Sequence, residues 1–560
     1  MGIPSYFSYI IKNYTNIIRK FHNCEKFHNL FMDCNSIIYD SYYELEEIYN
    51  NAPFDILLVE EQLIQKVISK IEYYIDFISP LNSVYITFDG VAPFAKMDQQ
   101  RLRRYKTQFM SKLANVNKIW NTSAITPGTQ FMDMLNRRIK HHFTPLNILN
   151  GTPEGVPLDV SIPINQLKST VIKYDRSNSN VHRCKNNSKI LISGSDEPGE
   201  GEHKIFKYIR DNNLLNENIA IYGLDSDLIM LSIFHKQFTK KIYVFREAPN
   251  FKSILSNHFN KNEKLFMDIY SLCSAIQNEM NNGQKATCIY DYIFMCFLLG
   301  NDFLPHFPSL NIRTNGFQIL LDTYFNIIGK HEERCFIDNN NNIQWNFVYL
   351  FLNEISKNEK EYIINEYVSR DLMDNRSWSS STPSEIEQLV SNIPIIYRQD
   401  EKYICPREHG WEKRYYKVLF DIIPTEEEIK KICMNYLEGL EWVFKYYTKD
   451  CPDWKWKYNY HYPPLIKDLI KYIPKKEKEF IMKSKEVSFH PKTQLAYVLP
   501  YENLDLLGEK DSLYIRENYA KLYPFNYEFK WAFKRYMWES EAVLPEISKE
   551  VLELWDEYFI

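Results

Sequence analysis

The sequence predicts an α/β protein in which a mainly parallel sheet, flanked by helices, is followed by a mostly helical C-terminal domain. Short apolar runs alternate with helical patterns up to about residue 325, which is typical of strands joined by crossover helices. Acidic residues follow several of these runs directly. From about residue 385 the apolar spacing becomes mostly helical. A chain of 560 residues is too long for one compact core, so two or three domains are expected.

The first part of the chain carries apolar runs of strand length, rich in β-branched and aromatic residues. These runs span residues 28–33, 83–88, 189–193, 219–223 and 241–246. Helical patterns lie between and after them, over residues 58–79, 95–118, 203–211 and 290–299. Because parallel strands need long crossover connections, this order predicts one sheet with helices on both faces.

The second part is expected to follow a connecting segment. Two polar stretches, Asn339–Asn342 and Ser377–Pro383, are typical of loops. We therefore expect domains over residues 1–330 and 385–560, joined by residues 331–384. Helical patterns in the last domain cover residues 385–393, 412–421, 425–446, 511–520 and 547–558. Residues 143–188, rich in Pro, Asn and Ser, are expected to form a less ordered insertion.

Composition excludes several classes of protein. A net charge of −5 argues against a generally basic nucleic-acid coat protein, although a local basic channel is compatible with it. The ten cysteines form no Cys-x-x-Cys pair, which argues against zinc ribbons and indicates thiols in a reducing compartment. No apolar run has transmembrane length, and the first residues lack the pattern of a signal peptide. A cytoplasmic protein without membrane association is therefore expected.

Seven carboxylates form the main candidate site. They follow apolar runs or stand beside glycines, and they are Asp33, Asp89, Glu200, Glu202, Asp225, Asp227 and Asp302. Carboxylates at the carboxyl ends of parallel strands converge on one crevice. With no compensating base expected among them, they need cations, and hard oxygen ligands suit Mg²⁺ or Mn²⁺. The pattern predicts a two-metal phosphodiesterase. For a single acidic pair, the better interpretation is that the carboxylates complement the helix dipole at the start of a helix. For two pairs and three single acids together, that interpretation would need five coincidences.

A basic stripe follows Asp89 on the predicted helix 95–118. Its members recur at helical spacing and are Lys96, Gln100, Arg103 and Arg104. Cations and an amide in one row suit a phosphate pocket, since Arg offers forked donors that match phosphate oxygens. Most stripes of this kind are simply basic helix faces exposed to solvent. The short distance in sequence from Asp89 favours the phosphate pocket.

Other candidate residues have structural explanations. The aromatic run over residues 454–462 and Trp538 could stack on unpaired bases, but most rings in so Tyr-rich a chain belong to the core. His203 and His461 are expected to be hydrogen-bonded structural residues. We find no triad, nucleophile elbow or Walker loop, which argues against acyl transfer and nucleotide-driven motor functions.

Several motifs together resemble the Xrn family of 5′→3′ exoribonucleases, which are relatives of the flap-endonuclease and PIN-type nucleases. The motifs are MGIPSYF at residue 1, FMDCNSII at residue 31, FDGVAPFAKM at residue 88, ITPGT at residue 125, PGEGEHKI at residue 198 and LLGNDFLPH at residue 298. A second block of similarity covers residues 410–416 and 439–461, and a weaker similarity covers residues 538–545. The resemblance extends over nearly the whole chain and implies a PIN/FEN-like catalytic domain with a helical domain after it. The chain is similar to compact members, and its composition suits a large DNA virus or an AT-rich protist.

The resemblance also implies roles for individual residues. The seven carboxylates would bind two Mg²⁺ ions, for which Mn²⁺ can substitute, and the stripe from Lys96 to Arg104 would hold a 5′-monophosphate. Trp538 would stack with the terminal bases. Its partner in the family is a His, and this position is Tyr39 here. Phe94 stands where many members carry Arg, which removes one cation near the pocket.

The expected function is a Mg²⁺-dependent, processive 5′→3′ exoribonuclease. It would act as a monomer on single-stranded RNA with a 5′-monophosphate and release nucleoside 5′-monophosphates. A flap-type DNA 5′ nuclease on the same fold is one alternative, but Asp302 is followed by FLPHFPSLNIRTNGF rather than by a Gly-rich helix-turn-helix. A catalytically silent RNA-binding scaffold is the other. Seven retained carboxylates argue against it, since unneutralised acids destabilise a fold that has no use for metal.

Overall fold

The central feature of the computed structural model is a seven-stranded sheet in the order β1-β7-β6-β5-β2-β3-β4. The structure describes residues 2–3, 5–21, 24, 26–49, 56–114, 119–144, 188–247, 263–283, 288–374, 376–476 and 478–560. Five strands run parallel and confirm the five predicted runs: β2 (Asn29–Asp33), β3 (Ser83–Thr87), β4 (Lys189–Ser193), β5 (Leu214–Tyr222) and β6 (Thr239–Glu247).

Two further strands close one edge of the sheet in the antiparallel sense. They are β7 (Lys264–Asp268) and β1 (Ile18–Arg19). The sequence analysis missed both. Strand β1 has only two residues, which are too few to show a period. Strand β7 did carry a usable signal, because its sequence KLFMD closely matches NLFMD in β2.

The register of the parallel strands places their carboxyl ends level with one another. Asp33 pairs with Thr87, and Thr87 pairs with Ser193. On the other side of β2, Met32 pairs with Tyr222. Side chains that follow these strands therefore lie along one edge of the sheet.

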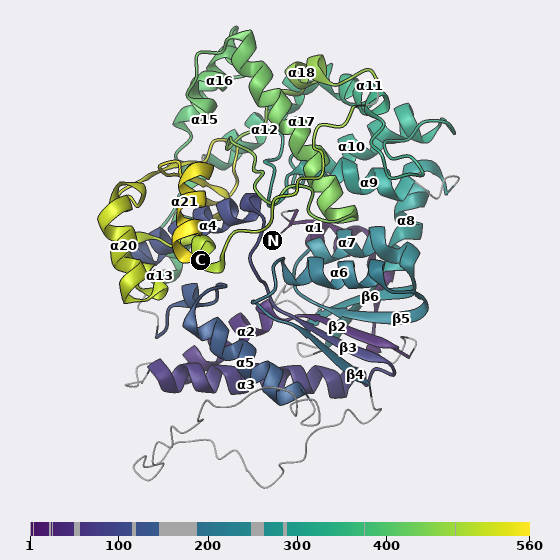
Figure 1. The fold of residues 1–560 in the computed structure, drawn as a ribbon. Helices are drawn as coiled ribbons and strands as arrows, with labels where there is room; N and C mark the ends of the chain where they lie inside the picture. Colours follow the sequence, from purple (N-terminus) through teal and green to yellow (C-terminus); the bar gives the residue numbers. More distant parts are fainter. Residues whose placement is uncertain are drawn as a thin grey trace, which may run out of the picture.

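Helices cover both faces of the sheet, because successive strand residues point to opposite sides. Leu30 and Met32 face one core, whereas Phe31 faces the other. In Figure 1 the first face carries α2 (Asn35–Tyr49), α3 (Ile56–Ile78) and α5 (Gln130–Phe143). The opposite face carries α6 (Gly201–Asp211), α7 (Asp227–His235), α8 (Ile269–Asn281) and α9 (Cys288–Cys296), together with α1 (Tyr6–Asn13).

The rest of the chain is mostly helical, as predicted. Its helices are α10 (Gly316–Tyr324), α11 (Trp345–Ser356), α12 (Glu359–Asp374), α13 (Pro383–Ser391), α14 (Ile393–Ile396), α15 (Gln399–Ile404), α16 (Trp411–Phe420), α17 (Glu426–Thr448), α18 (Ile466–Leu469), α19 (Pro491–Val498), α20 (Glu509–Tyr519) and α21 (Lys549–Phe559). A small antiparallel pair, β8 (Glu528–Lys530) and β9 (Glu541–Val543), lies near the end. Among the described residues no helix is both long and apolar enough to cross a membrane.

Helix α4 (Phe94–Ala114) joins the sheet layer to the C-terminal elements, since it contacts α13, α19 and β9. Figure 1 shows it among the C-terminal helices α13, α20 and α21. Phe94 is buried and meets the rings of Phe489 and Tyr497 edge-on. Its apolar side chain thus packs the start of α4 against the α19 region.

The predicted loops are present where the structure describes them. Asn339–Asn342 forms a turn in which Asp338 accepts backbone hydrogen bonds from Asn340 and Asn342. Thr382 caps α13 in a capping box with Glu385, and Pro383 opens that helix. Of the insertion expected over residues 143–188, residues 145–187 lie outside the described chain, as do residues 115–118 of the predicted helix 95–118.

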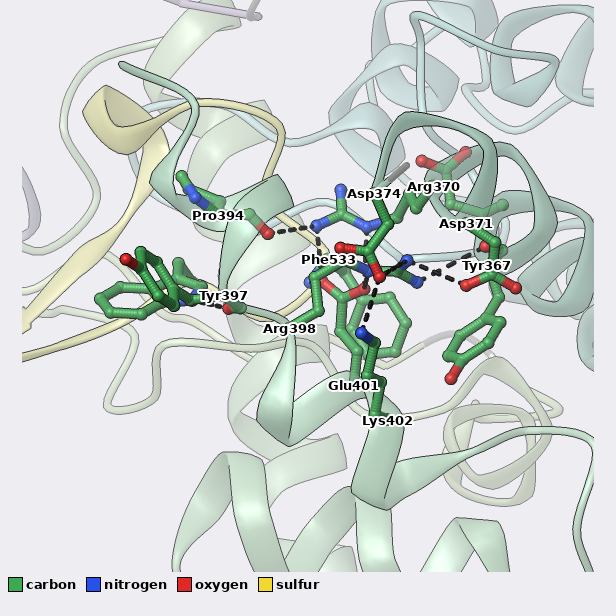
Figure 2. A network of polar contacts seen from close by, with 12 residues as sticks. Tyr367, Arg370, Asp371, Asp374, Pro394, Tyr397, Arg398, Glu401, Lys402 and Phe533 are labelled. Atoms are coloured by element: carbon green, nitrogen blue, oxygen red, sulfur yellow. Dashed lines mark hydrogen bonds and ion pairs between the residues drawn. The ribbon is translucent and has the colours of Figure 1, made fainter. Parts of the chain in front are cut away.

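A buried polar network joins α12, α15 and the loop before Trp538 (Figure 2). Glu401 is fully buried and accepts hydrogen bonds from Arg370 Nη2 at 2.5 Å and Arg398 Nε at 2.7 Å. It also accepts the backbone N–H of Phe533 at 2.8 Å. Phe533 has a φ of 60°, a left-handed conformation that a non-glycine residue adopts at a cost. The carboxylate therefore holds this turn in place.

Candidate active site

Six of the seven carboxylates follow the carboxyl ends of parallel strands. Asp33 ends β2, and Asp89 lies two residues after β3. Glu200 and Glu202 open α6, while Asp225 and Asp227 lie between β5 and α7 and at the start of α7. Asp302 instead follows the short 3-10 helix that extends α9. Most of these side chains are buried or half-buried, and Asp225 is exposed.

Two groups within this set are close enough to share an ion. Ligand oxygens of Asp33, Asp89 and Glu202 all lie within 4.8 Å of one another. Glu200, Glu202 and His203 form a second group within the same limit. Glu202 belongs to both groups and therefore links them.

Lys96 corrects the expectation that no base lies among the carboxylates. Its Nζ lies 2.5 Å from Glu200 Oε2 and 2.7 Å from Asp302 Oδ2. The negative charges around it hold the pKa of this buried lysine well above its usual value, although burial alone would lower it. Lys96 reaches these acids because it lies in the first turn of α4, directly after the β3 loop.

Asn35 and the backbone of Gly201 orient Asp89. Gly201 N–H donates to Asp89 Oδ1 at 2.7 Å, and the Asn35 side chain donates to Asp89 Oδ2. A Cβ on Gly201 would lie 2.7 Å from Asp33 Oδ1, so the backbone of α6 approaches the carboxylates as closely as only glycine allows.

The electrostatics of the cluster favour a bound cation. Burial, with the charges of neighbouring carboxylates added, raises the pKa of Asp33, Asp89 and Glu202. One of the carboxylate oxygens, Asp227 Oδ1, is buried and finds no hydrogen-bond partner within the described residues. One lysine among seven carboxylates leaves a large negative charge, and the carboxylate oxygens are donors that fit Mg²⁺ or Mn²⁺.

Asp227 gives a pH prediction for the metal-free protein. Burial and the nearby Asp302 raise its pKa from 3.8 to about 7. The folded state thus keeps a proton that the unfolded state loses near pH 4, so the stabilisation this carboxyl provides declines from about pH 4 to about pH 7 and is constant above. Asp227→Asn should therefore gain stability over wild type across this range, by at most about 4 kcal/mol. Urea unfolding in the presence of EDTA at several pH values measures the stability of both proteins. A stability difference that does not change with pH would contradict the prediction.

The four residues of the predicted phosphate stripe do not converge on one point. Lys96 binds the carboxylates, and Gln100 Oε1 accepts from Gln494 Nε2 at 3.3 Å. Arg104 donates to Ser123 O at 3.2 Å and to the hydroxyl of Thr126. Burial lowers the pKa of Arg104 to about 10, while the neighbouring Tyr39 acts in the opposite sense.

Arg103 lines a cavity of about 370 Å³ that also contains Asp302 and Trp538. Four further cations line it: Lys106, Arg313, Lys457 and Lys534. Sequence reasoning missed these four, although Lys106 lies three residues after Arg103 on α4 and continues its face. Four acids line it as well, namely Asp98, Asp302, Glu539 and Glu541. Glu539 pairs with Arg313 and Asp98 pairs with Lys457, so the cavity carries charges of both signs.

The two predicted stacking residues occupy different settings. Trp538 is 42% exposed on the cavity wall, and the Arg313 guanidinium lies 5.6 Å from its ring. Tyr39 lies on α2, half-buried against the core beneath that helix, and is not among the cavity residues. In the run 454–462, Trp456, Tyr458 and Tyr462 are buried, which agrees with the core interpretation.

Comparison with known proteins agrees with this arrangement. Residues 1–248 match the family model of the XRN 5′-3′ exonuclease N-terminus, and residues 282–402 and 396–554 match the Xrn1 helical domain. The chain is 24% identical to chicken 5′-3′ exoribonuclease 2, over 99% of this chain and 69% of the relative. It is 25% identical to the 5′-3′ exoribonuclease 1 of Saccharomyces cerevisiae, over 90% of this chain and 40% of the relative. The chain belongs to the Xrn family of 5′→3′ exoribonucleases.

Proposed function

We propose that this chain is a Mg²⁺-dependent, processive 5′→3′ exoribonuclease that releases nucleoside 5′-monophosphates from single-stranded RNA bearing a 5′-monophosphate. The observation that carries the proposal is the meeting of Asp33, Asp89 and Glu202 within 4.8 Å, in a chain of this family whose Asp302 lines a cavity together with Arg103. We further propose that it acts as a monomer in the cytoplasm, since its sequence has no long basic run of the kind that directs nuclear import.

The proposed metal ligands are the seven carboxylates, with Glu202 placed between the two groups. When bound there, two Mg²⁺ ions would orient the attacking water and neutralise charge on the scissile phosphate and the departing 3′-oxygen. Asn35 and the Gly201 N–H keep Asp89 oriented toward the cluster. Lys96 neutralises part of the charge of Glu200 and Asp302, and its ammonium is available to a phosphate oxygen at the same place.

Selection of the 5′-monophosphate is assigned to Lys96, Gln100, Arg103 and Arg104. Arg103 carries most of this proposal, because its side chain lines the cavity that contains Asp302. Gln100 and Arg104 are not among the residues that line this cavity, and they are bound to Gln494 and Ser123, so each would exchange its present partner for phosphate. Exclusion of a 5′-triphosphate or a cap is part of the proposal.

The cavity beside Asp302 is the proposed path of the RNA strand. Its cations Lys106, Arg313 and Lys534 suit a phosphate backbone, and Trp538 offers a flat ring for a base. Tyr39, beside Arg104, is the proposed second stacking residue. Continuous backbone contact between cleavage steps accounts for the proposed processivity.

One experiment tests the proposal. Purified protein is incubated with 5′-monophosphate, 5′-hydroxyl and 5′-triphosphate versions of one labelled RNA, with Mg²⁺ or with EDTA. We expect Mg²⁺-dependent loss of the monophosphate RNA alone, with mononucleotide products, and we expect Arg103→Ala to reduce this preference. Equal cleavage of all three would refute the phosphate pocket and favour a flap-type nuclease. Binding without cleavage would favour a silent scaffold.

Gly2 gives a further prediction. It has a φ of 53°, and a Cβ at this position would lie 2.0 Å from Asp227 Oδ1. Gly2→Ala should therefore displace Asp227 and lower kcat by about a hundredfold, as a displacement of about 1 Å in an active site can do. Gly508→Ala is the matched control, because Gly508 also has a positive φ but nothing lies within 4 Å of the added Cβ. Equal kcat values for the two variants would contradict the prediction.

A further inference from the structure

Helix α17 brings two adjacent tyrosines from the C-terminal helical region to the carboxylate cluster. It packs against α7, the helix that Asp227 opens, and Figure 1 shows it descending toward the α7 layer. Neighbouring residues of a helix point about 100° apart, so one helix can reach two places at once. The hydroxyls of Tyr446 and Tyr447 contact two different carboxylates, Glu200 and Asp227.

Tyr446 contacts Glu200, one carboxylate of the cluster. Its hydroxyl donates to Glu200 Oε1 at 2.8 Å, while Lys96 binds the other oxygen of the same carboxylate. The ring is buried and stacks on His203 with centroids 3.7 Å apart and planes at 19°. Trp442, one turn earlier on α17, packs against the ring at 4.9 Å. The hydroxyl position is therefore set by rigid neighbours.

Tyr447 belongs to the surroundings of Asp227. Its hydroxyl interacts electrostatically with the carboxylate of Asp227, and its ring packs edge-on against Phe297 at 5.2 Å. Asp227 Oδ1 has no hydrogen-bond partner within the described chain. A tyrosine hydroxyl is protonated at neutral pH, so each of these side chains can donate a hydrogen bond to a carboxylate.

Packing alone does not account for these hydroxyls. Tyr436 on the same helix is equally buried, but its hydroxyl donates to a backbone carbonyl, that of Pro305, at 3.0 Å. The Tyr446 hydroxyl instead donates to Glu200, and the Tyr447 hydroxyl interacts with Asp227, both acids of the proposed metal site. A donor on one carboxylate oxygen fixes which way the other oxygen points, which is the usual effect of groups that surround metal ligands.

We propose that Tyr446 and Tyr447 are positioning residues that orient Glu200 and Asp227 for divalent-metal binding, so that the helical region completes the site of the nuclease layer. The proposal rests on the proposed function, because it takes these acids as metal ligands. It predicts that loss of either hydroxyl weakens metal binding while leaving the affinity for RNA unchanged.

The experiment compares Tyr446→Phe, Tyr447→Phe and the control Tyr436→Phe. Metal-stripped proteins are titrated with Mn²⁺ in a calorimeter, with no RNA present. We expect the affinity for Mn²⁺ to fall about tenfold in each of the first two variants and to be unchanged in the control. In activity assays the Mg²⁺ concentration needed for half-maximal rate should rise in parallel, with KM for RNA unchanged.

A further variant, Asp227→Ala, separates the tyrosine proposal from the proposed metal site. If Asp227→Ala weakens Mn²⁺ binding while both tyrosine variants bind like Tyr436→Phe, the tyrosine proposal is overturned and the metal site stands. If wild-type protein binds no Mn²⁺, or Asp227→Ala binds as wild type does, both proposals fail. Thermal unfolding of each metal-free variant shows whether a weaker affinity reflects an altered fold, and a fall in affinity that tracks a fall in stability would also overturn the tyrosine proposal.

Discussion

The double variant Asp225→Ala/Asp227→Ala is expected to degrade 5′-monophosphate RNA at least about a thousandfold more slowly than wild type, the upper range for loss of one strong electrostatic contribution. The two acids lie just before α7 and at its first residue, and Asp227 Oδ1 has no hydrogen-bond partner among the described residues. Without them, a proposed metal loses ligands on one whole side of the cluster. The rate is measured by release of labelled mononucleotides under single-turnover conditions.

The fold should survive this change. Removal of two carboxylates from a crowded acidic cluster relieves repulsion in the metal-free protein, so its unfolding temperature should not fall. The control replaces two other acids, Asp211 and Asp450, which are exposed and paired with Lys207. Asp211→Ala/Asp450→Ala should retain wild-type activity. A double variant at Asp225 and Asp227 that kept more than about a tenth of the rate would exclude the carboxylates as the catalytic centre.

Glu401→Ala is expected to lower the free energy of unfolding by about 3–5 kcal/mol, the range for breaking a buried ion pair. Arg370 and Arg398 are both fully buried and both donate to this carboxylate (Figure 2). Its removal leaves two guanidinium groups short of their shared acceptor. It also frees the N–H of Phe533, whose left-handed conformation depends on that contact.

Urea denaturation measures the loss, and Asp505→Ala provides the comparison. Asp505 is exposed and pairs with Arg516, so its removal should cost no more than about 1 kcal/mol. Because the Phe533 turn leads to Lys534 and Trp538 on the cavity wall, Glu401→Ala protein that remains folded should also bind RNA more weakly. Equal stability losses for Glu401→Ala and Asp505→Ala would show that the network contributes little.

The strands and the grouping of carboxylates were predictable because both follow from local pattern. A buried parallel strand is a short run of β-branched and aromatic residues, as in β3, and this pattern needs no knowledge of the rest of the chain. An acid directly after such a run must lie at the carboxyl edge of the sheet. Asp33 and Asp89 were therefore assigned correctly to one edge without coordinates.

Contacts made across long stretches of chain were not predictable in the same way. The pairing of Lys96 with Glu200 and Asp302 joins residues that are 104 and 206 positions apart in the numbering. Helical periodicity placed Lys96 in a stripe with Gln100 and Arg104, but it could not say which neighbour each side chain would meet. Gln100 and Arg104 proved to be bound by Gln494 and Ser123.

By itself, the sequence determined the fold class, the positions of the five parallel strands and the candidate set of acidic residues, because hydrophobic periodicity and the ends of strands are local properties. Only the tertiary structure decided that Lys96 lies inside the acidic cluster, that Trp538 lies on the wall of the cavity that contains Asp302 and that Tyr446 reaches Glu200. Each of these contacts depends on how α4 and α17 pack against distant elements, and packing is set by the whole core rather than by any window of sequence.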